Sequence, residues 1–168
     1  MRSKNLPFFL RRIPEPKSMG EIELDAFEEI TNKNFRFWLI PLVDDIVRHL
    51  KTKKTYILDV ACGPGLLTRE LARRLSFIRI VGVDIEPYAI QLAQKNCHGL
   101  ANTTFQKGDI RHLPFPDHTF DVVVCKDSLH HFPSAGKAIC EMIRVTKTNG
   151  LIYIQDLRRD LPLYLLRR

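Results

Sequence analysis

Short apolar runs alternate with amphipathic segments between residues 56 and 154, and this alternation constrains the fold more than any other feature. Runs rich in valine and isoleucine are typical of strands, whereas apolar residues at three- and four-residue steps are typical of helices. We expect strands at 56–61, 79–83, 103–106, 122–125 and 150–154. Between them we expect helices at 66–75, 87–97 and 135–145. The alternation predicts βαβ units and a parallel α/β sheet that helices cover on both faces.

The segment before the first strand divides into two parts. Residues 1–19 contain three prolines and no clean periodicity, so we expect an extended arm there. Residues 21–50 have helical periodicity, and Pro41 should kink this region or divide it into two helices. We therefore interpret residues 20–168 as one domain.

Composition narrows the class of protein. The 168-residue chain is 45% hydrophobic, which suits one folded domain. Its net charge of +7 is concentrated near both ends. We interpret these charged ends as solvated tails rather than as a binding site for an anionic partner, because no nucleic-acid motif accompanies them. No apolar stretch approaches the ~20 residues of a membrane span. The four cysteines form no metal-binding spacing, so we expect no metal, reduced thiols and a cytoplasmic protein.

A glycine loop follows the first expected strand. Gly63 and Gly65 flank Pro64 and precede a helix, and glycines there allow positive φ angles and close approach of a ligand to the backbone. Ligands of open parallel sheets bind beyond the carboxyl ends of the strands. The glycine pair by itself is equally compatible with a tight turn that binds nothing.

Acidic residues mark the ends or beginnings of successive strands. They are Asp59, Asp84, Asp109 and Asp127. Unpaired carboxylates at one edge of a sheet would repel one another, so their presence favours a bound ligand with cationic and hydroxyl groups. Asp84 lies nineteen positions beyond Gly65, where an acid can accept hydrogen bonds from ribose hydroxyls.

Two cofactor classes fit such an edge. A dinucleotide site favours the pattern G-x-G-x-x-G, which places a pyrophosphate at a helix N-terminus. Here Thr68 occupies the third glycine position, and Asp59 lies inside the preceding strand. S-adenosylmethionine has no phosphate and carries an ammonium group that an acid suits. The sequence therefore favours S-adenosylmethionine, and an NAD-dependent oxidoreductase is the more distant alternative.

The motifs together resemble those of class I S-adenosylmethionine-dependent methyltransferases of the small-molecule type. The resemblance covers about residues 35–157 and rests on residues 57–65 (ILDVACGPG), 81–85 (VGVDI), 108–110 (GDI), 113–115 (LPF) and 120–124 (FDVVV). It implies a Rossmann-like, doubly wound sheet of five parallel strands in the order 3-2-1-4-5, with N-terminal helices. It also implies an enzyme that transfers a methyl group from S-adenosylmethionine to a small-molecule acceptor.

The resemblance assigns cofactor roles by position. Asp59 and the backbone of Gly63 and Gly65 would hold the methionine end, and Asp84 would bind the ribose hydroxyls. Ile85 and Asp109 would contact the adenine. The full set of implied cofactor-binding residues is Asp59, Ala61, Cys62, Gly63, Gly65, Asp84, Ile85, Gly108, Asp109, Ile110, Lys126 and Asp127.

Catalysis needs few dedicated residues, because the methyl donor is already activated and positioning supplies much of the rate. A base is required only if the acceptor must lose a proton. His130, His131 and Asp127 are the candidates, although a histidine pair there can equally serve packing and capping. The asparagine-proline motif typical of nucleobase and glutamine methylation is absent, which favours a small-molecule acceptor.

The C-terminus departs from the family pattern. Only twelve residues follow Asp156, which is too few for the final helix and antiparallel hairpin of the family. The last strand would then expose an apolar edge. We expect a truncated chain, with a homodimer through this edge as an alternative. The competing functional hypothesis is a cofactor-binding module without a complete acceptor site and with little activity.

Overall fold

The computed structural model describes residues 20–34, 37, 39–50, 54–132 and 135–156, and its centre is a five-stranded sheet. The strands are β1 (Tyr56–Val60), β2 (Arg79–Asp84), β3 (Thr103–Lys107), β4 (Phe120–Lys126) and β5 (Thr146–Gln155). All neighbouring strands pair in parallel, in the order β3-β2-β1-β4-β5. The predicted fold class and strand order are confirmed. The expected arm at 1–19 and the charged C-terminal tail lie outside the described residues.

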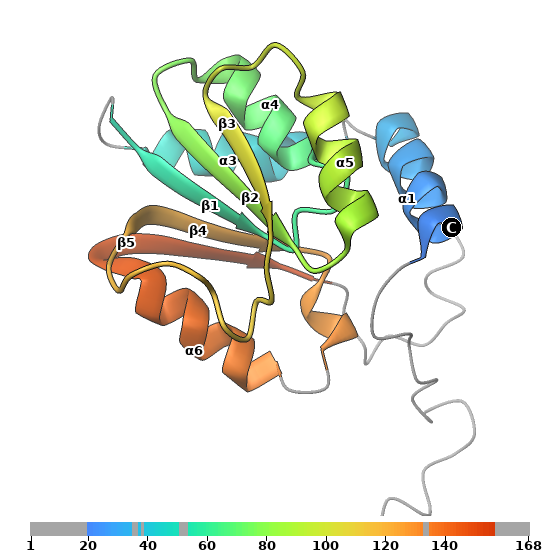
Figure 1. Ribbon diagram of the computed structural model, residues 1–168. Helices are drawn as coiled ribbons and strands as arrows, with labels where there is room; N and C mark the ends of the chain where they lie inside the picture. The colour runs from blue at the N-terminus through green and yellow to red at the C-terminus, as the bar shows by residue number, and fades with distance from the viewer. Residues whose placement is uncertain (1–19, 35–36, 38, 51–53, 133–134, 157–168) are drawn as a thin grey trace, which may run out of the picture.

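Helices cover both faces of the sheet (Figure 1). The covering helices are α3 (Ile40–His49), α4 (Leu66–Arg74), α5 (Pro87–Asn96) and α6 (Ala135–Val145). Helix α1 (Glu21–Lys33) packs beside α5, and the short 3₁₀ helix η2 (Leu129–His131) follows β4. Pro41 lies in the first turn of α3, where its missing N–H leaves no helical hydrogen bond unmade. The helical region before β1 is therefore divided, as the sequence predicts.

Alternating residues of the central strands build two cores. Ile57 of β1 packs with α3 and α4 on one face, and the next residue, Leu58, packs with α6 on the other. β4 behaves in the same way, with Val122 and Val123 on opposite faces. Both faces are apolar because both are covered, which explains why these strands read as continuous apolar runs.

The last strand begins earlier than its sequence suggests. The sequence pattern predicts a strand at 150–154, but β5 already starts at Thr146. Thr146 pairs with Phe120 and Leu151 pairs with Val122, so a register shift accommodates the extra residues. β5 lies at an edge of the described sheet, with Ile152 and Ile154 37% and 45% exposed.

Candidate functional site

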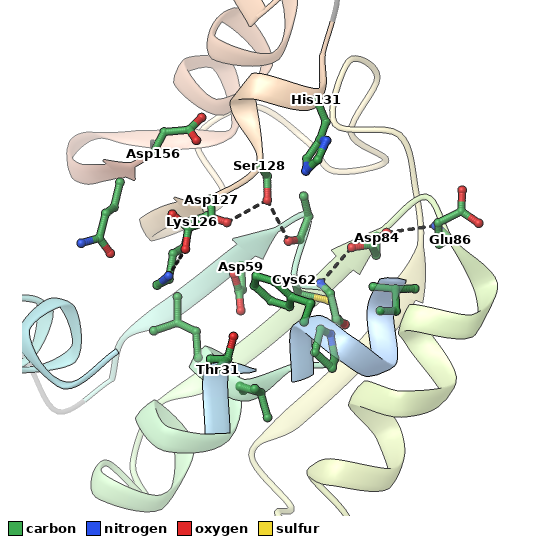
Figure 2. A pocket seen from close by; sticks show the side chains of 18 of the residues that line it. Thr31, Asp59, Cys62, Asp84, Glu86, Lys126, Asp127, Ser128, His131 and Asp156 are labelled. Carbon is green, nitrogen blue, oxygen red and sulfur yellow. Dashed lines mark hydrogen bonds and ion pairs between the residues drawn. The ribbon is translucent and has the colours of Figure 1, made fainter. Parts of the chain in front are cut away.

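A cavity of about 660 Å³ lies beyond the carboxyl ends of β1, β2, β4 and β5. Its floor comes from the loops that follow these strands, and α1, in blue in Figure 2, forms one of its walls. This is the edge at which parallel sheets bind their ligands. Ten of the expected cofactor-binding residues line it: Asp59, Ala61, Cys62, Gly63, Asp84, Ile85, Gly108, Ile110, Lys126 and Asp127.

The loop after β1 owes its shape to left-handed backbone. Ala61, Gly63 and Gly65 have φ angles of 53°, 52° and 73°. The amide of Gly65 donates to the carbonyl of Cys62 across 3.0 Å and closes the turn. A Cβ on Gly63 would meet no atom within 4 Å, so open space adjoins the backbone at this position. The loop thus exposes backbone to the cavity, as a ligand-binding turn requires.

Asp84 ties this loop to the end of β2. One carboxylate oxygen accepts a hydrogen bond from the Gly63 amide at 2.8 Å, and the other accepts from the Glu86 amide at 3.0 Å (Figure 2). Burial raises the pKa of Asp84, and the two amide donors oppose that shift. A carboxylate has about four lone-pair sites, so two amides leave capacity for a ligand's hydroxyl groups.

Asp59 is the most deeply buried acid of the site. It is 2% exposed, and the Thr68 hydroxyl donates a hydrogen bond of 2.7 Å to it. Burial raises the pKa of Asp59 to about 7, although the bond from Thr68 partly opposes the rise. The neighbouring charge of Asp84 raises this pKa further, whereas Lys126 lowers it. A cationic group in the cavity would favour the ionised form of Asp59.

The end of β4 brings another charged pair into the cavity. Lys126 and Asp127 form an ion pair, and Asp127 has a left-handed φ of 50°. The Asp127 amide donates to the carbonyl of Gln155 across 2.7 Å. The Ser128 hydroxyl donates to the carbonyl of Lys126 across 2.8 Å. These contacts fix the turn that carries η2 over the cavity.

All three candidate catalytic residues, His130, His131 and Asp127, line the cavity. Asp156 holds His130 twice, because its carboxylate accepts from the His130 amide at 3.0 Å and contacts Nδ1 at 2.5 Å. A carboxylate on Nδ1 fixes the ring orientation of a histidine and leaves Nε2 directed elsewhere. The two histidine rings lie 4.0 Å apart between centroids. His130, supported by Asp156, is therefore the stronger candidate for a base.

Two expected cofactor residues lie outside the cavity lining. Arg111 binds both carboxylate oxygens of Asp109, at 2.6 to 3.0 Å, and this pairing lowers the pKa of Asp109. Gly65 instead packs against α5, where a Cβ would lie 2.8 Å from the Cβ of Ala93. The expectation of unpaired acids at this edge is also wrong, because each of the four acids has a hydrogen-bonding or charged partner.

Sequence reasoning missed the wall that α1 supplies. Its residues Leu24, Phe27, Ile30 and Thr31 line the cavity. Polar contacts hold this helix against α4 and α5: Arg69 donates to Asn32 at 3.1 Å, Tyr88 to Asp25 at 3.0 Å and Asn96 to Glu28 at 2.9 Å. The amphipathic pattern indicated a helix here but not what its apolar face would cover.

Comparison with known proteins identifies the family. A model described as "Methyltransferase domain" matches residues 51–166, more than half of the chain. The chain belongs to this methyltransferase-domain family. The resemblance inferred from the motifs is thereby confirmed.

One curated relative and two solved structures illustrate the similarity. A phthiotriol/phenolphthiotriol dimycocerosates methyltransferase of Mycobacterium ulcerans is 33% identical over 110 residues, which are 66% of this chain and 40% of that protein. A SAM-dependent methyltransferase from Aquifex aeolicus shares the fold, with a TM-score of 0.70 and 20% identity over 86% of this chain and 78% of that one. The [4+2]-cyclase SpnF has a TM-score of 0.62 and 29% identity over 67% of this chain and 43% of SpnF. This methyltransferase domain thus spans about 40% of the length of the curated relatives that it matches.

Proposed function

We propose that this methyltransferase domain binds S-adenosylmethionine in the cavity and transfers its methyl group to a small-molecule acceptor by in-line displacement. The observation that carries the proposal is the position of Asp84. Its carboxylate lies at the end of β2, faces the cavity and is held by the glycine loop after β1. A ribose with two adjacent hydroxyl groups matches a carboxylate fixed in this way.

The remaining residues fit the other parts of this cofactor. Ile85, Gly108 and Ile110 offer an apolar and backbone surface beside Asp84 for the adenine. Asp59 and Asp127 lie on the β1 and β4 side, where they suit a cationic amino-acid end. We leave the Asp109 side chain out of this set, because it lies outside the cavity lining and pairs with Arg111. When bound, the cofactor supplies a methyl group on a sulfonium.

The residues of the chain then have two tasks. The walls of the cavity position the acceptor and exclude water, which brings the acceptor atom into line with the methyl group. His130, oriented by Asp156, accepts a proton from an acceptor that must lose one. His131 and Asp127 line the same cavity and are the alternative proton acceptors.

Calorimetric titration with S-adenosylmethionine and S-adenosylhomocysteine tests the binding step. Mass spectrometry of a small-molecule acceptor panel tests transfer through a gain of one methyl group per molecule. Both measurements are needed, because a relative of this domain is described as a [4+2]-cyclase. Failure to bind either ligand at millimolar concentration would refute the proposal for this chain. Binding without turnover on any acceptor would favour a cofactor-binding module.

We further propose a homodimer through β5 and a cytoplasmic location. The first rests on the exposed Ile152 and Ile154 at the edge strand, since such edges pair readily with another chain. Light scattering should show a dimer that Ile154→Lys dissociates, and a monomeric unaltered chain would refute it. The second rests on four free cysteines, and fractionation of cells should test it. No helix in the described part of the chain is long and apolar enough to cross a membrane.

A further inference from the structure

Thr31 has a buried hydroxyl group without a hydrogen-bond partner among the described residues. The residue is 2% exposed, and its Oγ1 lies within the cavity wall that α1 provides. In Figure 2 the side chain points from α1 toward the interior of the cavity, on the side of Asp59. A buried polar group without a partner is unfavourable, and such groups in native proteins call for an explanation.

The helix itself does not provide that explanation. A threonine within a helix usually turns its hydroxyl back to the carbonyl four residues earlier, which here is that of Phe27. Oγ1 of Thr31 makes no such bond. Its position therefore suits a group that occupies the cavity.

The first turn of α4 lies against this part of α1. Arg69 of α4 donates to Asn32, the neighbour of Thr31, across 3.1 Å. Leu66 and Leu67 line the cavity, and no side chain caps the α4 N-terminus after Gly65. A helix N-terminus carries partial positive charge and favours an anionic group. Thr31 and α4 thus offer neutral donors from two sides.

The described residues of the cavity lining offer few charged donors to an anion, although Arg69 lies behind this wall with a buried Nε that has no partner. Among the described residues of the cavity lining, Lys126 is the only lysine or arginine, and Asp127 pairs with it. Near Thr31 and the start of α4, hydroxyl and amide groups are therefore the donors that the described lining residues offer to an anionic group. The acids Asp59 and Asp127 in the same cavity suit a neighbouring cation, so the site as a whole matches a zwitterion.

We propose that Thr31 binds the carboxylate of the amino-acid end of the cofactor, together with the backbone amides at the start of α4. This rests on the proposed function, because it assigns a contact within the same cavity. The Thr31 hydroxyl donates a hydrogen bond to the carboxylate, while Asp59 faces the ammonium group. Helix α1 then recognises the cofactor as well as lining the cavity.

The test compares ligands with and without the amino-acid end. S-adenosylhomocysteine has this end, 5′-methylthioadenosine lacks it, and decarboxylated S-adenosylmethionine lacks only the carboxylate. We would measure the Kd of each for the unaltered chain, for Thr31→Val and for Thr31→Ser. Valine preserves the shape of threonine without the hydroxyl, and serine preserves the hydroxyl. A hydrogen bond to a charged group predicts that Thr31→Val weakens S-adenosylhomocysteine binding about tenfold.

The other measurements separate recognition from folding. Thr31→Val should change the Kd of 5′-methylthioadenosine and of decarboxylated S-adenosylmethionine less than twofold, and Thr31→Ser should keep S-adenosylhomocysteine binding within about threefold. The ligand-free Tm of Thr31→Val should equal or exceed that of the unaltered chain, because the variant removes a buried polar group without a partner.

Two results would overturn the proposal while leaving the proposed function intact. One is equal weakening of all three ligands by Thr31→Val, which would assign Thr31 a packing role. The other is unchanged S-adenosylhomocysteine binding. Failure of the unaltered chain to bind S-adenosylhomocysteine would instead refute both proposals.

Discussion

Thr68 donates a hydrogen bond of 2.7 Å to Asp59, and both side chains lie within the protein, away from solvent. The bond joins the first turn of α4 to the central strand β1. It also partly offsets the burial that raises the pKa of Asp59 to about 7, from a usual value of 3.8. The folded protein therefore holds a proton on Asp59 at pH values where the unfolded chain has released it.

This proton makes stability depend on pH in a known direction. Between about pH 4 and pH 7 the native state binds more protons than the unfolded state, so the free energy of unfolding falls as pH rises. A shift of about three pKa units corresponds to at most about 4 kcal/mol across this window. Asp59→Asn keeps an acceptor for Thr68 but cannot titrate, so its stability should fall much less. Urea unfolding at pH 5 and pH 8 measures the difference, and parallel losses in both proteins would contradict it.

Asp84→Ala should lower both the stability of the glycine loop and the affinity for the ligand. The amides of Gly63 and Glu86 lose their acceptor, which should destabilise the fold by about 1 to 3 kcal/mol. The Kd of S-adenosylhomocysteine should rise at least tenfold. Glu86→Ala is the matched control, because it removes a nearby carboxylate of the cavity lining that is not the acceptor of either amide. Equal effects of the two substitutions on Kd would show that only the charge of the cavity matters.

Gly65 and Gly63 should respond differently to alanine. Both have positive φ, which costs an alanine about 1 to 2 kcal/mol. At Gly65 the new Cβ would also lie 2.8 Å from the Cβ of Ala93, whereas at Gly63 it would meet nothing within 4 Å. Overpacking adds about 1 to 3 kcal/mol, so Gly65→Ala should be the less stable variant in urea unfolding. Gly63→Ala should instead weaken ligand binding, because its Cβ would enter the space beside the cavity. If Gly63→Ala proved less stable than Gly65→Ala in urea unfolding, the proposed packing role of Gly65 would be refuted.

Arg144 should stabilise the loop that leads from β3 to β4. Its guanidinium donates to the carbonyls of Leu113 and Phe115, at 3.0 and 2.7 Å, and to the carboxylates of Asp117 and Glu141, both at 2.8 Å. Arg144→Met leaves two backbone carbonyls without this donor, so we expect a loss of about 1 to 3 kcal/mol. Because the same loop carries Ile110 of the cavity lining, S-adenosylhomocysteine binding should weaken as well.

Arg74→Met is the control for Arg144→Met. The side chains of Arg74 and Arg144 are 33% and 30% exposed, but within the described residues Arg74 pairs only with the carboxylates of Asp44 and Glu70. Exposed ion pairs contribute about 0 to 1 kcal/mol, so this variant should lose little stability and no ligand affinity. If thermal unfolding shows a larger loss of stability for Arg74→Met than for Arg144→Met, the backbone hydrogen bonds of Arg144 do not stabilise the loop as predicted.

The central sheet was predictable because its buried strands are rich in apolar residues. Apolar residues predominate at 56–60, 80–83 and 122–125, since both faces of the sheet are covered. The start of β5 was not predictable in the same way. Its residues 147–150 are polar or glycine and resemble a turn, and only the register shift against β4 places them within the strand.

The site was predictable where its residues directly follow strands of the predicted parallel sheet. Gly63 and Asp84 follow neighbouring parallel strands, which predicts that they lie at one edge of the sheet; their hydrogen bond was not predicted. Asp109 was predicted less well, because Arg111 two positions later competes for its carboxylate. The positions of Thr31 and Asp156 depend on how α1 and β5 meet distant parts of the chain, and local sequence patterns do not contain that information.

Helix α1 contributes little to the cores on which the sheet depends. Leu24 is its one buried apolar residue, and it packs with Ala89 and Leu92 of α5 in a cluster separate from the two sheet cores. The other anchors of α1 are hydrogen bonds near the surface. Its cavity-facing side chains other than Thr31 can consequently diverge while the sheet persists unchanged. Gene duplication followed by change in this one helix would give a new acceptor preference at low risk to folding, and chimeric proteins with exchanged α1 segments offer the same route in the laboratory.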